Sequence, residues 1–179
     1  MNIQFRPLKA EEIEVRVDRI GEKGAIFLLY KDARCDMNIL DETVGPQNWR
    51  RTHEVINGNL FCNIDIWDDS KKEWVRKQDV GTESNAEKEK GQASDSFKRA
   101  GTNWGIGREM YTKIFIFIPG ITKPTGKTDA KGKPVFTLID PFLKFHVMEI
   151  STEPVQKKIK KLVLGDAKDI VAFRWEDRS

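Results

Sequence analysis

Residues 79–105, DVGTESNAEKEKGQASDSFKRAGTNWG, decide the fold of this chain. An extended segment ends at Gly81, a polar break follows, and residues 86–111 then change to helical spacing. One apolar stripe runs along this stretch and consists of Ala93, Phe97, Ala100 and Trp104. Because such a stripe must be buried against another layer, we expect this long helix to pack on a sheet.

The residues before this segment predict the strands of that sheet. Alternating and continuous apolar runs indicate strands, and Asn57-Gly58 is the strongest hairpin signal in the chain. The predicted strands are 14–20, 25–30, 49–56, 60–67 and 73–80, and a shorter helix is predicted over 31–44. The fold class is therefore α+β: a mixed or antiparallel sheet in the order β-β-α-β-β-β-α, with the long helix packed on it.

The C-terminal third of the sequence has a different pattern of residues. Residues 119–134 contain three prolines, three glycines and four lysines, which predicts an exposed, mobile loop. Strands are then expected over 143–151, 158–164 and 170–175. We predict a main domain over 1–118, a flexible loop over 119–134 and a β-rich extension of the same domain over 135–179.

Composition excludes several classes of protein. No apolar run approaches the roughly 20 residues of a membrane-spanning helix, and the start of the chain lacks the pattern of a secretory signal. The two cysteines make no disulfide framework, so a reducing cytoplasm is expected, bacterial or that of a phage-infected host. The net charge of +3 is small: residues 123–179 carry a basic surplus of four, and the first 122 residues are almost neutral. A DNA-binding groove in the first part would therefore be a local cluster of basic side chains.

Two groups of motifs carry a family resemblance. The first is Tyr30-Lys-Asp-Ala-Arg34, followed by Gly45 and Trp49; the second is Asp79-Val-Gly81, Glu87-Lys-Glu-Lys90, Phe97-Lys-Arg-Ala100 and Trp104-Gly105. Over roughly residues 10–118 the chain resembles the N-terminal annealing domain of the Rad fifty-two family of recombination proteins, closest to its phage-encoded members. In that family a strand ends in Asp-Val-Gly, and a long helix carries Lys-Arg-Ala before an aromatic-Gly pair.

The resemblance implies a protein that binds single-stranded DNA and anneals complementary strands in homologous recombination and DNA repair. It implies a ring of identical subunits, no enzymatic activity, and no cofactor or metal ion. A single-strand-binding protein is a further candidate partner, and no membrane is involved. Phosphate contacts from Lys and Arg would hold the strand without reading its sequence, as an annealing protein requires.

The resemblance also implies DNA-binding residues. Lys98 and Arg99 match the basic pair on the long helix, whose lysine is implicated in DNA contact in the family. Lys90 matches another helix lysine. Arg34 matches an arginine after the second strand, with Cys35 as a rival if the alignment slips by one residue. The plainer alternatives are a solvated helix edge for Lys98 and Arg99, and an ion pair with Asp32 or Asp36 for Arg34.

Three positions depart from the family. Thr102 and Glu89 stand where basic residues occur on the long helix, and Asn59 stands where a lysine serves a second, outer DNA site. The sequence therefore predicts the primary groove and leaves the outer site open.

Other functions stay open. A plain single-strand-binding protein needs the same groove, and a scaffold ring would lack DNA binding. Asp65, Asp68 and Asp69 would serve a metal-dependent nuclease, although acidic residues are expected in a turn anyway. Lys157, Lys158, Lys160 and Lys161 fit either a second DNA contact or a charged strand that discourages aggregation.

Overall fold

The computed structural model describes residues 3–82 and 88–178. Its contacts divide the chain into two compact units. The helical unit comprises Met1–Leu8 and Asp32–Arg108, and the sheet unit comprises Lys9–Lys31 and Glu109–Ser179. Each unit is thus built from two separate stretches of chain, and the predicted boundaries at 118 and 134 both fall inside the sheet unit.

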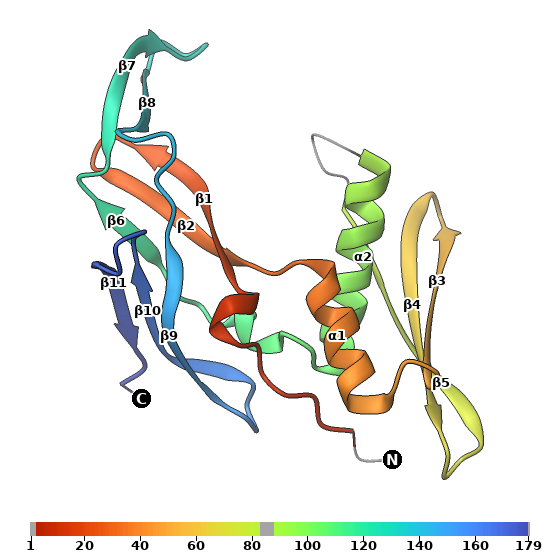
Figure 1. Cartoon of the computed structure of the whole chain (residues 1–179). Helices are drawn as coiled ribbons and strands as arrows, with labels where there is room; N and C mark the ends of the chain where they lie inside the picture. Colours follow the sequence, from red (N-terminus) through yellow and green to blue (C-terminus); the bar gives the residue numbers. More distant parts are fainter. Residues whose placement is uncertain (1–2, 83–87, 179) are drawn as a thin grey trace. The chain divides into compact units, whose positions relative to one another are not determined.

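The helical unit holds two helices and a three-stranded antiparallel sheet in the order β3-β4-β5 (Figure 1). Its elements are α1 (Ala33–Val44), β3 (Trp49–Ile56), β4 (Asn59–Asp68), β5 (Glu73–Val80) and α2 (Lys88–Trp104). Helix α2 packs on β4 and β5, as the apolar stripe predicts. No helix in the described part of the chain is long and apolar enough to cross a membrane.

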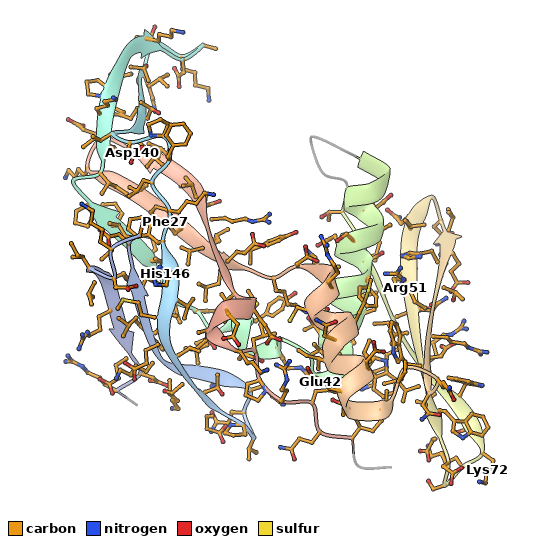
Figure 2. The ribbon with its side chains drawn as sticks, viewed as in Figure 1. Phe27, Glu42, Arg51, Lys72, Asp140 and His146 are labelled. Atoms are coloured by element: carbon orange, nitrogen blue, oxygen red, sulfur yellow. The ribbon has the colours of Figure 1, made fainter. Side chains whose placement is uncertain are left out.

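The sheet unit holds a six-stranded antiparallel sheet in the order β11-β10-β9-β1-β2-β6 and a separate hairpin, β7–β8. Its strands are β1 (Glu14–Gly21), β2 (Gly24–Tyr30), β6 (Ile116–Pro119), β7 (Thr122–Thr128), β8 (Pro134–Leu138), β9 (His146–Glu153), β10 (Lys158–Gly165) and β11 (Val171–Glu176). Phe27 of β2, labelled in Figure 2, meets Phe145 edge to face with 5.1 Å between ring centroids, and both rings are buried.

The α+β class and the element order β-β-α-β-β-β-α are confirmed. The sequence did not show that these strands belong to two sheets. The hairpin β1–β2 pairs with β9 and β6, whereas β3–β5 form a sheet of their own. The C-terminal strands are therefore part of the sheet that β1 and β2 begin. Strand pairing across a long sequence separation leaves no local pattern, so the alternation of residues cannot predict it.

The predicted loop over 119–134 is wrong for about half of its length, because β7 and the start of β8 occupy it, although the segment is largely exposed as expected. Prolines suggested a loop since proline cannot donate to a strand ladder. In a ribbon of only two strands each strand has an unpaired side, so Pro124 and Pro134 are tolerated there. Gly126 and Gly132 adopt positive φ of 77° and 75°, which glycine allows without strain.

Local signals placed the turns of the helical unit correctly. Asn57 and Gly58 both have positive φ, 51° and 77°, as the two-residue turn between β3 and β4 requires. The long helix ends earlier than predicted, at Trp104, because Gly105 and Gly107 leave the helical conformation with φ of 103° and 63°. A short 3-10 helix, Arg108–Tyr111, follows.

The face of the β3–β5 sheet that carries Asp65 lies opposite the one that buries Ile64 and Ile66. The Asp65 carboxylate is almost fully buried, and two arginines from the neighbouring strands bind it. Arg76 Nε lies 2.7 Å from Oδ1 and Arg50 Nε lies 2.9 Å from Oδ2. The Arg76 guanidinium, followed by Arg50, lowers the pKa of Asp65 against the opposing effect of burial. This carboxylate therefore ties the three strands together.

Asp65→Asn should lower the free energy of unfolding by about 2 kcal/mol at pH 7, because charge-assisted hydrogen bonds become neutral ones. The folded-state pKa lies below the unfolded value of about 3.9, so the stabilisation is present above that pH and is lost as the pH falls through the folded pKa. Denaturant unfolding at several pH values should show the gap between variant and parent shrinking on acidification.

Asp69→Asn is the matched control, because Asp69 pairs with Lys72 on the surface with both side chains largely exposed. That variant should change stability by less than about 0.5 kcal/mol. Equal effects of the two substitutions would contradict the role given to Asp65.

Candidate nucleic-acid interface

Helix α1 begins at a charged N-cap. Asp32 Oδ1 accepts a hydrogen bond from the backbone N–H of Arg34 at 2.8 Å, which satisfies one of the free donors of the first turn. The Arg34 guanidinium bends back to the same carboxylate, with Nε 3.3 Å from Oδ1. Its side chain remains 83% exposed. Arg34 therefore pairs with Asp32, one of the two partners considered from sequence, and still presents a cation to solvent.

Lys98 on α2 acts on this same carboxylate. The pKa of Asp32 is lowered first by the hydrogen bond from the backbone of Arg34, then by its guanidinium, and also by the charge of Lys98. Helices α1 and α2 are in contact, which agrees with an electrostatic influence of Lys98 on the N-cap of α1. Two residues 64 positions apart in sequence, both predicted as DNA contacts, share one neighbourhood around Asp32. We call Asp32, Arg34 and Lys98 the Asp32 cluster.

Arg99 points to a different neighbour. Its Nε lies 3.4 Å from Oδ1 of Asp79 on β5, and its side chain is 41% exposed. Asn103, one turn further along α2, donates to Oδ2 of Asp79 at 3.2 Å. Asp79 thus ties α2 to the end of β5. The structure separates Lys98 from Arg99, as neighbours about 100° apart on a helix must be.

Two further sequence predictions have different outcomes. Lys90 belongs to the first turn of α2, and its side chain lies outside the described residues. Cys35, the rival of Arg34, is buried in α1 and has no surface to offer a ligand. Burial raises the pKa of the second thiol, Cys62, to about 12. Neither cysteine is placed to contact DNA.

Contacts within the helical unit explain why the Asp-Val-Gly motif ends in glycine. Gly81 is buried where the chain leaves β5, and a Cβ there would lie 2.2 Å from the carbonyl oxygen of Gln92 and 2.7 Å from the backbone nitrogen of Ser96. Only glycine lets the α2 backbone come this close. Gln92 in turn donates to the carbonyl of Gly81 at 3.3 Å. The motif therefore sets the position and rotation of the helix that carries Lys98.

An arginine on β3 was missed from sequence. The Arg51 guanidinium, labelled in Figure 2, lies 4.7 Å from the centroid of the Phe97 ring, and Trp49 stacks on the same ring at 6.2 Å. The strand period could have found it, because Trp49 and Arg51 share one face of β3 and Phe97 belongs to the stripe that faces the sheet. Arg51 remains exposed, so it is a further cation of this unit.

The aspartates considered for a nuclease are engaged within the fold. Asp65 binds two arginines, and Asp68 accepts from the Ser70 hydroxyl at 2.6 Å, which is the main cause of its pKa falling to about 2. Within residues 3–82 and 88–178, no group of three or more His, Cys, Asp or Glu side chains could hold a metal ion.

The basic residues of β10 are likewise paired. Lys160 Nζ lies 2.8 Å from Asp177 Oδ2, and Lys161 Nζ lies 2.7 Å from Glu149 Oε1. Hydrogen bonds from the backbone N–H groups of Gln156 and Val155 lower the pKa of Glu153, and the charges of Lys160 and Lys158 lower it further. The charge of this cluster is largely balanced by nearby carboxylates.

Gly81→Ala should destabilise the protein by about 1–3 kcal/mol, because the added methyl group forces α2 and β5 apart. Urea unfolding measures the loss. Gly21→Ala is the control, since a Cβ at Gly21 meets nothing closer than 3.8 Å and should cost little. A fully stable Gly81→Ala variant would show that the close approach of α2 is dispensable.

None of the known protein-family models, curated proteins or solved structures matches this chain.

Proposed function

We propose that this protein binds single-stranded DNA and anneals complementary strands, as a ring of identical subunits that performs no chemical step. The observation that carries the proposal is the Asp32 cluster. Its two cations come from the two separate segments that resemble the Rad fifty-two family. A strand bound there would be held by its phosphates, which leaves the bases free to pair.

The electrostatics of the helical unit support a phosphate ligand. Arg50 and Arg76 are held by Asp65, and Arg99 by Asp79, so these three arginines already serve the fold. In the Asp32 cluster, by contrast, the charges of Arg34 and Lys98 both act on one carboxylate, and the Arg34 side chain stays 83% exposed. A phosphate approaching Arg34 and Lys98 would compete with Asp32 for them. Removal of a cation should therefore weaken phosphate binding, and removal of the carboxylate should strengthen it.

Lys98→Ala should weaken binding to single strands of any sequence and reduce the salt slope of the affinity by about one, because one phosphate contact is lost. Asp32→Asn should have the opposite effect and bind more tightly, since it removes the competing carboxylate while asparagine keeps the N-cap. Fluorescence anisotropy with labelled oligonucleotides, repeated over a range of salt concentrations, measures both effects.

Lys144→Ala is the control for charge alone, because Lys144 is an exposed lysine of the sheet unit. Circular dichroism should show the parental fold for all variants. Parental affinity in both Lys98→Ala and Asp32→Asn would rule out the Asp32 cluster as a DNA contact.

The sheet of the helical unit supports assembly. Strands β3 and β5 are its two edges, and Val55 on β3 is 70% exposed. Exposed edges are templates for pairing with another chain, and a closed ring of identical subunits covers them. Light scattering after size exclusion should therefore give a mass many times 20.6 kDa, and electron microscopy should show rings. A stable monomer at micromolar concentration would contradict the ring.

Annealing separates this proposal from plain strand coating. The protein should accelerate the pairing of complementary oligonucleotides, whereas a protective coat slows it. Incubation of labelled DNA with magnesium should leave the DNA intact. Cleavage would favour the nuclease alternative.

A further inference from the structure

The hairpin β7–β8 in the sheet unit is rich in lysine and poor in acidic residues. Residues 122–138 contain four lysines and a single acidic residue, Asp129. The lysines are Lys123, Lys127, Lys131 and Lys133, and all four are exposed. None of their ammonium groups has an ion pair or hydrogen bond within the described residues. We call residues 122–138 the lysine hairpin.

The one carboxylate of the hairpin is used by its turn. Asp129 Oδ1 accepts from the backbone N–H of Lys131 at 2.8 Å and of Lys133 at 2.9 Å. It therefore shapes the tip and leaves the lysine ammonium groups unpaired. Lys127, Lys131 and Lys133 lie in or beside this turn, so most of the charge gathers at the far end. On β10, by contrast, Lys160 and Lys161 are matched by carboxylates.

The base of the hairpin is anchored to the turn between β1 and β2 (Figure 1). Gly120 N–H donates to the carbonyl of Lys23 at 3.1 Å, and the Thr122 hydroxyl donates to the carbonyl of Glu22 at 3.2 Å. Leu138 at the end of β8 is buried. The seven residues of β7 at about 3.3 Å each make an arm of roughly 20 Å that is held at one end.

The arm does little for the hydrophobic core. Every residue from Lys123 to Val135 is exposed, so both faces of the ribbon are solvated over most of its length. A two-stranded ribbon without an apolar face is only marginally stable in water. Its lysines are exposed, so they add no buried surface that would stabilise it. The exposed lysines suit a ligand with regularly spaced negative charges, which can be bound without a shaped pocket.

We propose that the lysine hairpin is a second DNA-binding element, which holds the phosphates of single-stranded DNA outside the Asp32 cluster. The choice of ligand rests on the proposed function, and the existence of the arm does not. Lysine ammonium groups on flexible stems bind phosphate as point charges without reading bases. The arm therefore adds affinity and salt dependence, and it leaves sequence preference unchanged.

The test compares two variants with the same change in net charge. The arm variant is K123Q/K127Q/K131Q/K133Q, and the control is K9Q/K113Q/K144Q/K168Q, which alters four exposed lysines elsewhere in the sheet unit. Both are measured with labelled oligothymidine over a range of salt concentrations. The arm variant should lower the salt slope by up to about 3, because each lost phosphate contact on a single strand contributes about 0.7. The control should change the slope much less.

Three results overturn the proposal in distinguishable ways. Equal losses in the two variants would show that only overall charge matters. A parental salt slope in the arm variant would remove the arm as a contact, while binding by the parent would leave the proposed function standing. No binding by the parent protein would overturn the proposed function and the arm together. A larger loss in the arm variant, with parental circular dichroism, supports the arm.

Discussion

The close approach of α2 to the end of β5 is the constraint on which the helical unit depends. Gly81 leaves no room for a side chain between itself and the backbone at Gln92 and Ser96. Asp79, two residues earlier, binds Arg99 and Asn103 of the same helix. One contact limits the distance and the other limits the rotation. Helix α2 therefore has one position in which Phe97 is buried, Arg99 faces β5 and Lys98 approaches the start of α1.

This arrangement explains why some cations are available and others are not. A buried carboxylate must be paired, and Asp65 recruits two arginines for that purpose. Those arginines stabilise the sheet and have little left to offer a ligand. Asp32 lies at a helix start, where its first partner is a backbone N–H, and the Arg34 side chain that also pairs with it stays 83% exposed. Under the proposed function, the same residue types would thus serve structure in one place and recognition in another, because burial of the carboxylate differs.

In the described part of the sheet unit, too, some lysines are paired with carboxylates and others are not. Lysines on β10 lie across from acidic residues of neighbouring strands, since a six-stranded sheet places side chains of adjacent strands side by side. Among the residues that the structure describes, no further strand pairs with β7 or β8. No carboxylate from an adjacent strand therefore faces the lysines of the hairpin there. Nearby carboxylates, and not the number of lysines, therefore distinguish the β10 lysines from those of the lysine hairpin.

The sequence by itself determined the α+β class, the order of strands and helices up to α2, and the turn at Asn57-Gly58, because these depend on local periodicity and on the backbone freedom of glycine and asparagine. Through its family resemblance it also indicated Arg34, Lys98 and Arg99 as candidate DNA-binding residues. Only the tertiary structure decided that the strands form three sheets and that about half of residues 119–134 is strand. It also decided that the charges of Arg34 and Lys98 both act on Asp32, whereas Arg99 pairs with Asp79 of β5. Each of these results depends on which distant residues meet, and a pattern of neighbours along the chain contains no record of such contacts.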